Sequence, residues 1–434
     1  MGKIRGISTP HNKNTKTSKP AALPVPEQVN IPMSMHSGTP AKPVVRPGDD
    51  VKVGQLIGEA DGFVSSPVHA SVSGKIKSIN DRDPITGRED VSITIASDGE
   101  QNQYEGLEPP PVTNLDEFLA AVGASGVVGL GGAGYPTAPK LTLKQSVELD
   151  YILINGAECE PYITSDTRTM VDDAEHVFEG ALLLKKYLKP KKIIICIERN
   201  KPEALAKMRE ISGGDGGESG LEVRELPSMY PQGERKVLVY NVTGRIVPEG
   251  GRLSDVGCTV LNCATIAVFA RYIKHGTPLV SRVVTVDGSA VKHPANVIAP
   301  IGAPVRELFE YCGGLSEDVK KILLGGPMMG VSIPNTEMPV VKTTNSALAF
   351  RSKDSELPAP TACIRCGRCA ANCPMKLMTF EIERAHALKN PELLKRYKVN
   401  LCIECGCCAY LCPAHRPLLQ CITLSKQMIM QKRA

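Results

Sequence analysis

Eight cysteines close to the C-terminus have the spacing that most directly indicates chemistry in this sequence. They form two copies of the pattern C-x2-C-x2-C-x3-C, each followed by a proline. The copies contain Cys363, Cys366, Cys369 and Cys373, and then Cys402, Cys405, Cys408 and Cys412. Three thiolates on one tight loop can bind three corners of an iron–sulfur cubane, and the fourth, displaced by its proline, points to another cluster.

This is the ligation pattern of bacterial two-cluster ferredoxins, in which the fourth cysteine of each copy ligates the other cluster. We therefore predict two [4Fe-4S] clusters and a protein that transfers electrons. Zinc and disulfides are the alternatives, but zinc normally takes four thiolates in two pairs, whereas these quartets each end in Cys-Pro. The expected ligands are Cys363, Cys366, Cys369 and Cys412 for cluster 1, and Cys402, Cys405, Cys408 and Cys373 for cluster 2.

The other seven cysteines are interpreted as buried, small apolar residues. Cys407 lies inside the second ligand loop and could compete for iron. Cysteines in cofactor spacing, without an export signal, indicate a reducing cytoplasm rather than a disulfide-forming compartment. The seven are Cys159, Cys196, Cys258, Cys263, Cys312, Cys407 and Cys421.

Length and charge limit the class of protein. The 434 residues suggest about three domains. A net charge of +5, with no tryptophan, gives no indication of a nucleic-acid partner. From Thr361 onward, 12 Lys/Arg against 4 Asp/Glu offset the negative clusters and could attract an acidic carrier. No run of 18 apolar residues occurs, so any membrane association is expected through a partner, not through a transmembrane helix of this chain.

Patterning along the chain predicts a multidomain α/β protein. Residues 20–112 have the Pro/Gly-rich, alternating texture of β structure. Residues 47–76 within them resemble the barrel-sandwich module of biotinyl and lipoyl carriers. No acceptor lysine lies between Glu59 and Pro67, so we interpret the module as a scaffold, with docking as the alternative. Residues 1–20 carry five Lys/Arg and no acid, which predicts a flexible basic arm, or alternatively a docking strand.

Helices and strands alternate after residue 112, which predicts a mostly parallel sheet. We expect strands at 151–154, 193–197 and 221–225, and helices at 115–123, 172–188, 202–211 and 233–242. Residues 279–335 resemble a small soluble-ligand-binding β-grasp domain. The expected units are an N-terminal arm with the barrel-sandwich module (1–112), an α/β domain (113–275), a β-grasp domain (276–341), a linker (342–360) and a ferredoxin-like α domain (361–434).

Three short motifs in the α/β region could bind a nucleotide. The glycine-dense residues 126–137 let backbone N–H groups approach a phosphate, and Lys140 could add a point charge. Residues 154–161 follow a strand, where ligands bind in doubly wound sheets, and carry two carboxylates. Residues 230–235 open a helix, where Glu234 could simply favour the helix dipole. A plain loop and a solvated acidic turn are the alternatives for the first two.

The order of these motifs resembles the flavin subunit of respiratory complex I. Residues 129–140 resemble its glycine run and lysine, residues 155–161 its Asn-x-Asp-Glu-x-Glu-Pro, and residues 261–265 its Asn-Asn-x-Glu-Thr. Gly233-Glu234 resembles its Gly-Glu-Glu. With the carrier-like module in front and two cluster motifs behind, nearly all of residues 20–425 resemble the C subunits of Rnf complexes, which are ion-translocating ferredoxin:NAD oxidoreductases.

The resemblance implies noncovalent FMN and a site for NAD(H). Departures at Leu130, Ala157, Leu261 and Ala264 imply weaker FMN binding than in complex I. The FMN residues implied are Gly131, Gly132, Gly134, Lys140, Asn155, Glu158, Asn262 and Thr265. The NAD(H) residues implied are Tyr135, Glu160, Tyr230 and Glu234.

The implied function is electron input to a membrane complex from the cytoplasmic side. NAD(H) exchanges a hydride, flavin converts two electrons into single ones, and each cubane carries one, so no catalytic acid–base side chain is expected. The implied partners are membrane subunits that move the ion and a ferredoxin-like iron–sulfur subunit. The alternatives are a related cobalamin reductase of microcompartments and a flavin-free iron–sulfur relay.

Overall fold

The N-terminal module consists of two small antiparallel sheets, as expected for a barrel sandwich. The computed structural model describes residues 6–82, 89–143, 147–214 and 219–431. Ile31 and Ile93, which are register partners on neighbouring strands of the module, are both fully buried. One sheet has the order β2 (Gln28–Pro32), β8 (Glu89–Ser97), β7 (Gly74–Arg82) and β4 (Asp50–Val51), and the other β3 (Lys42–Pro43), β5 (Leu56–Glu59) and β6 (Val68–His69).

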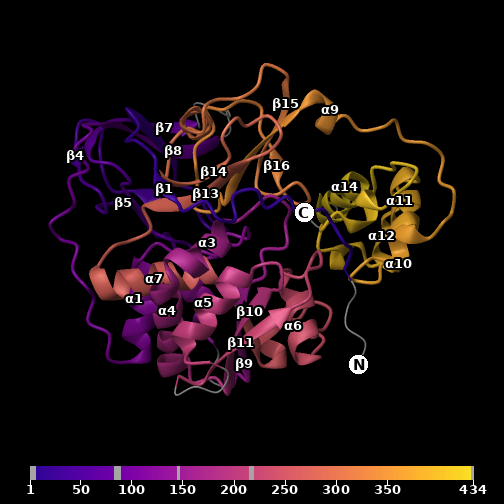
Figure 1. Ribbon diagram of the computed structural model, residues 1–434, viewed down its shortest axis with the longest axis horizontal. Coiled ribbons are helices and arrows are strands. Elements are labelled where there is room, and N and C mark those ends of the chain that lie inside the picture. The colour runs from indigo at the N-terminus through magenta and orange to yellow at the C-terminus, as the bar shows by residue number, and fades with distance from the viewer. Residues whose placement is uncertain (1–5, 83–88, 144–146, 215–218, 432–434) are drawn as a thin grey trace.

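The α/β domain is built on a four-stranded parallel sheet, as predicted (Figure 1). The consecutive residues Ile194 and Ile195 point to opposite faces and both are fully buried, because helices cover both faces. The strand order is β11 (Leu221–Leu226), β10 (Lys192–Glu198), β9 (Tyr151–Gly156) and β12 (Cys258–Asn262). The helices are α1 (Leu115–Ala124), α2 (Thr137–Leu141), α3 (Ser165–Asp172), α4 (Ala174–Leu188), α5 (Pro202–Ser212), α6 (Arg235–Thr243) and α7 (Cys263–His275).

The third unit is a six-stranded mixed sheet with helix α8 (Val305–Tyr311). Its outer strands are short, and one of them comes from the segment that follows the N-terminal arm. The order is β1 (Ala21–Ala22), β14 (Ala295–Pro300), β13 (Ser281–Asp287), β17 (Ser346–Arg351), β15 (Val319–Leu324) and β16 (Val331–Ser332).

The expected linker at 342–360 is wrong for residues 342–351. Strand β17 lies in the middle of the sheet, parallel to β13 and antiparallel to β15, with Leu348 fully buried. Lys342 is also buried, and its ammonium donates to the carbonyl oxygens of Pro67 at 2.6 Å and Gly126 at 2.8 Å. The prediction failed because the short, small-residue run of β17 is stabilised by strands distant in sequence. Only the part after α9 (Ser352–Ser355) is an exposed connection.

The predicted flexible basic arm is also wrong for residues 6–20, while residues 1–5 lie outside the described part of the chain. These fifteen residues form a strap across the α/β domain. Ile7 is buried and exchanges two backbone hydrogen bonds with Tyr230, of 2.7 and 3.0 Å. Figure 1 shows the indigo strap passing between the C-terminal domain and the α/β domain. The lysines of this segment predicted a solvated, flexible arm, but the Lys13 ammonium donates to backbone carbonyl oxygens inside the protein.

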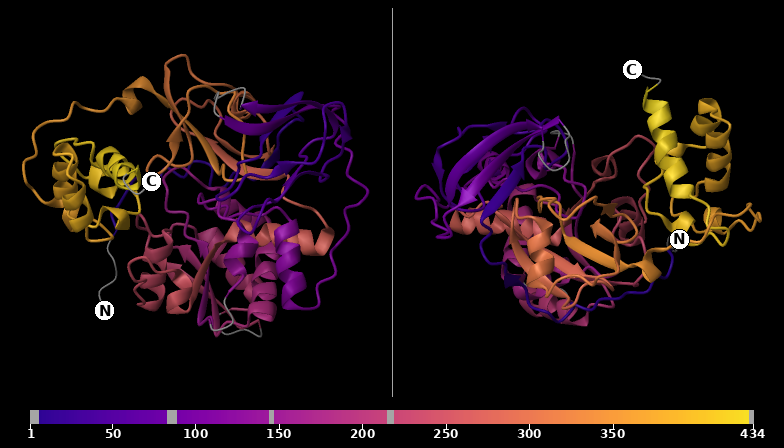
Figure 2. Two further views of the ribbon diagram at one scale, coloured as in Figure 1. Left: turned by 180° about the vertical axis from the view of Figure 1, so that it is seen from behind. Right: turned by 90° about the horizontal axis from the view of Figure 1, so that it is seen from above.

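The C-terminal domain is a small helical unit at one end of the molecule, reached by an extended connection that curves outside it (Figures 1 and 2). Two helices lie between the cysteine motifs, and Lys389, which adopts a positive φ of 48°, separates them. Among the described residues, the chain has no helix with the length and apolarity needed to cross a membrane. The helices are α10 (Arg368–Ala371), α11 (Thr379–Ala387), α12 (Pro391–Arg396), α13 (Cys407–Tyr410) and α14 (Leu418–Gln431).

Candidate functional site

The carboxyl edge of the parallel sheet gathers several of the predicted flavin residues. Asn155 near the end of β9 and Asn262 at the end of β12 are register partners. The glycine loop lies beside them, since a Cβ on Gly131 would stand 3.4 Å from the Asn262 Cβ. The backbone N–H of Leu130 donates to the Thr265 hydroxyl at 3.0 Å. This edge is where open α/β sheets bind ligands.

Glu158 and a residue that sequence reasoning missed, Asp166, extend this edge into an acidic cluster. The Glu158 carboxylate accepts hydrogen bonds from the backbone N–H groups of Asp166 at 2.7 Å and Thr167 at 3.3 Å. Asn262 donates to the Asp166 carboxylate at 2.6 Å. Burial, and then the like charge of Glu158, raise the pKa of Asp166 to about 7. Asp166 could not be found from sequence because its partner lies 96 residues away.

Lys140 supplies a buried positive charge near this edge. Its ammonium donates to the carbonyl oxygen of Val260. Burial and the neighbouring Arg235 lower the pKa of Lys140 to about 8. Gly132 has a φ of +109°, and its Cβ direction opens onto space that no described atom occupies within 4 Å. An open glycine loop, followed a few residues later in the chain by Lys140, is complementary to a phosphate, so the residues present fit FMN.

Of the four predicted NAD(H) residues, the structure brings Glu160 and Tyr230 into contact beside Cys405, and Glu234 lies close to the same cysteine. Tyr135 is half-exposed next to the glycine loop. Tyr230 is only 1% exposed, and its hydroxyl donates to the carbonyl oxygen of Cys405 at 2.7 Å. The Glu160 carboxylate accepts from the Met328 N–H at 3.1 Å, and burial raises its pKa to about 7. The Glu234 carboxylate caps the start of α6. This is the alternative role given for Glu234 above, that of an acidic residue favoured by the helix dipole.

Tyr230 belongs to a junction where four segments meet. Ile7 of the strap, Tyr230 of the α/β domain, and Cys405 and Cys407 of the second cysteine loop form one buried apolar cluster. Met328 of the β-grasp domain packs against it. The predicted ligand loop of cluster 2 is thus docked directly on the flavin-type domain.

The predicted ligands of cluster 2 converge in space. Cys373, from the first cysteine motif, and Cys402, Cys405 and Cys408, from the second, line one small cavity of ≈ 10 Å³. Burial raises the pKa of Cys402 to about 11 and that of Cys408 to about 12, so iron must displace protons to bind them. Four converging thiols are the donor set of a [4Fe-4S] cluster, so the residues present fit that group. In the described residues, no three His, Cys, Asp or Glu side chains are placed to hold a single metal ion.

The two cysteine loops share a backbone conformation but differ in surroundings. Arg365 and Glu404, at equivalent positions, both adopt φ = +56°, and Gly367 and Gly406 adopt +70° and +76°. The loop of cluster 1 is open to solvent, with Cys363 and Cys366 exposed and Cys369 and Cys412 half-buried, whereas Cys405 and Cys408 are buried.

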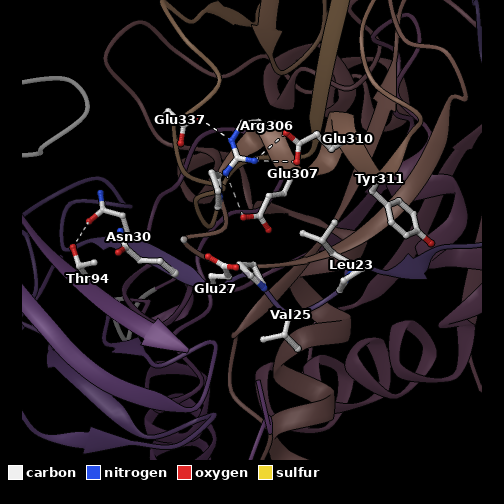
Figure 3. A pocket seen from close by; sticks show the side chains of 15 residues that line it. Leu23, Val25, Glu27, Asn30, Thr94, Arg306, Glu307, Glu310, Tyr311 and Glu337 are labelled. Atoms are coloured by element: carbon white, nitrogen blue, oxygen red, sulfur yellow. Dashed lines mark hydrogen bonds and ion pairs between the residues drawn. The ribbon is translucent and has the colours of Figure 1, made fainter. Parts of the chain in front are cut away.

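A larger cavity, of ≈ 820 Å³, lies away from these residues, between the N-terminal module and the β-grasp domain. Figure 3 shows Arg306 at its rim, paired with Glu310 and Glu337, and Glu27 and Asn30 on the facing side. It contains none of the predicted site residues. Size alone therefore does not locate the redox site.

Family models match four successive parts of the chain. Residues 3–100 match the RnfC barrel sandwich hybrid domain, and residues 122–271 the Nuo51 FMN-binding domain. Residues 283–332 match the SLBB domain, and residues 362–415 the 4Fe-4S dicluster domain. These matches confirm the predicted multidomain fold class and the predicted flavin and cluster cofactors.

Two curated relatives are similar over most of their length. The C subunit of the proton-translocating ferredoxin:NAD(+) oxidoreductase complex of Clostridium ljungdahlii is 38% identical, over 86% of this chain and 81% of the relative. The C subunit of the Na(+)-translocating complex of Acetobacterium woodii is 39% identical, over 87% and 85%. An NAD+-reducing [NiFe]-hydrogenase chain shares the fold, with a TM-score of 0.51 and 18% identity over 73% of this chain and 63% of that one.

Proposed function

Because the chain belongs to the family of C subunits of ion-translocating ferredoxin:NAD(+) oxidoreductase complexes, we propose that it is the subunit through which such a complex exchanges electrons with NAD(H). It binds peripherally to the cytoplasmic side of the membrane subunits, which move the ion. Its cofactors are FMN and two [4Fe-4S] clusters, and its electron partner is a ferredoxin-like iron–sulfur subunit. The FMN-binding match over residues 122–271 favours this function over a flavin-free relay.

FMN binds at the carboxyl edge of the α/β sheet. The backbone N–H groups of the glycine loop and the Lys140 ammonium hold the phosphate. Bound FMN supplies the conversion between two-electron and one-electron transfer. The residues that we assign to it are Gly131, Gly132, Gly134, Lys140, Asn155, Glu158, Asn262 and Thr265.

NAD(H) approaches the flavin from the exposed side of the glycine loop. Tyr135 is half-exposed there and offers a ring face for stacking. Glu160, Tyr230 and Glu234 act on this site through the loops that they hold, because their side chains are engaged at the junction and at the start of α6.

With FMN and both clusters bound, Cys373, Cys402, Cys405 and Cys408 would hold cluster 2 next to the flavin domain, so that electrons would reach it before cluster 1. The single observation that carries this order is the Tyr230–Cys405 hydrogen bond, which joins the flavin domain to the loop of cluster 2. The loop of cluster 1 is exposed and carries Arg365 and Arg368, so it suits transfer to an acidic partner.

The order is tested by removing one cluster at a time from the full chain, reconstituted without oxygen. In Cys408→Ala, NADH should still reduce the flavin but reduce cluster 1 far more slowly. In Cys369→Ala, NADH should reduce cluster 2 at the wild-type rate. Stopped-flow absorbance and EPR measure both. Equally fast reduction of cluster 1 in Cys408→Ala would contradict the order.

A further inference from the structure

Lys13 of the strap is bound inside the α/β domain by three backbone carbonyl groups. Its ammonium donates to the carbonyl oxygens of Glu158 at 2.8 Å, Glu160 at 2.8 Å and Ile163 at 2.5 Å. The side chain is 9% exposed, and the ammonium lies 4.0 Å from the Glu158 carboxylate. Three converging acceptors match the three donors of an ammonium group.

The loop that Lys13 holds has an unfavourable backbone conformation. Glu158 and Tyr162 have φ values of +45° and +68°, a region that non-glycine residues avoid and that persists only where the surroundings impose it. The strap makes two further bonds to this segment. Tyr162 N–H donates to the His11 carbonyl oxygen at 3.0 Å, and the hydroxyls of Thr15 and Thr164 are hydrogen-bonded.

The same loop carries the acidic side chains of the proposed redox site. It leads from β9 to α3 and directs the Glu158 carboxylate onto the first backbone N–H groups of that helix. It also directs the Glu160 carboxylate to the Met328 N–H at the junction. A change in the loop would therefore displace both carboxylates.

We propose that Lys13 is a positioning residue for the flavin site: from the strap, its ammonium holds the loop 158–163 in the conformation that places Glu158 and Glu160. This inference rests on the proposed function and extends it to a residue outside the α/β domain. A methionine of similar length would leave three buried carbonyl groups unpaired, and a planar guanidinium does not match three converging acceptors.

The test compares Lys13→Met with Lys19→Met, an exposed lysine of the same strap, in the full chain with iron loaded. FMN fluorescence should show the dissociation constant of Lys13→Met raised by about tenfold or more, as expected for lost charge-assisted hydrogen bonds. Its KM for NADH should rise while its iron content stays at the wild-type level. Lys19→Met should behave as wild type.

Chemical rescue separates positioning from general stability. In Lys13→Ala, ethylammonium should restore part of the FMN affinity, because a small ammonium can occupy the three-carbonyl site. Wild-type FMN affinity and KM in Lys13→Met would overturn the inference. Loss of iron and of cooperative unfolding in parallel with FMN, without rescue, would also overturn it. If wild type itself binds FMN but is not reduced by NADH, the proposed function fails, whatever Lys13 does.

Discussion

Three buried lysines donate to backbone carbonyl groups within the α/β domain and at its borders with other modules. Lys140 lies on the α/β domain itself, Lys13 reaches in from the strap, and Lys342 reaches from the β-grasp side to the barrel-sandwich module. Each ammonium donates to at least one backbone carbonyl oxygen, and burial lowers the pKa of all three. A lysine that the sequence predicts to be solvated can therefore be buried and hold two segments together through hydrogen bonds.

Lys140→Met should weaken FMN binding by about 10- to 100-fold, because a hydrogen bond to a charged group contributes about 1.5–3 kcal/mol. Fluorescence titration of FMN measures this. Lys189→Met, on an exposed lysine just after α4, is the control. Unchanged FMN affinity in Lys140→Met would remove Lys140 from the phosphate site.

Lys342 should make folding stability depend on pH. Burial lowers its pKa from 10.5 to about 7, so above pH 7 the unfolded chain binds a proton that the folded chain has lost. Stability from this group therefore rises with pH through this window. Relative to Lys342→Met, the wild-type free energy of unfolding should increase by about 2 kcal/mol between pH 7 and pH 9, as urea unfolding would show. A constant difference would contradict the buried position.

At the scale of elements, the sequence predicted the features that depend on neighbouring residues, and it missed those that depend on residues far along the chain. The cysteine loops and strand β10 could be predicted because neighbouring residues determine them: the spacing of the cysteines defines each loop, and a continuous apolar run defines the buried strand. Strand β17 and the strap depend on partners far along the chain, such as β13 and Tyr230. Asp166 was missed for the same reason, because the residue that places it in the site, Asn262, is far away in the sequence.

Leu348→Ala tests the central position of β17. The side chain is fully buried, so its loss should destabilise the protein by about 2–5 kcal/mol in chemical unfolding. Leu357→Ala changes a residue of the true connection that is 80% exposed, and it should alter stability by less than about 0.5 kcal/mol. Equal, small effects of both substitutions would restore the linker interpretation.

At the scale of the whole molecule, charge and exposure are unevenly distributed. The cluster domain (361–434) carries a net charge of +8, whereas the whole chain carries +5, and its residues Cys363 and Cys366 are exposed. This domain lies at one end of the molecule (Figure 2). Its other cysteine loop is docked on the flavin domain through Tyr230. In the proposed electron path, the flavin domain is thus followed by a buried cysteine loop and then by an exposed, basic one.

Electron transfer from cluster 1 to an acidic ferredoxin should slow as ionic strength rises, because exposed charges are screened within about 10 Å at 0.1 M salt. The double variant Arg365→Glu/Arg368→Glu should lower the second-order rate and reduce its salt dependence. Arg252→Glu, on an exposed residue of the α/β domain, should change neither. Stopped-flow kinetics at two salt concentrations would show the difference, and a salt-independent wild-type rate would argue against transfer through the exposed, basic loop.

The central claim is that one chain holds a flavin and two cubanes that NADH reduces. The most direct measurement is oxygen-free reconstitution of the full chain, with iron analysis and EPR during NADH titration. We predict about eight irons and one FMN per chain, and EPR signals of two reduced [4Fe-4S] clusters. Bound zinc, fewer than about eight irons, or clusters that NADH leaves oxidised in the FMN-loaded protein would contradict the account.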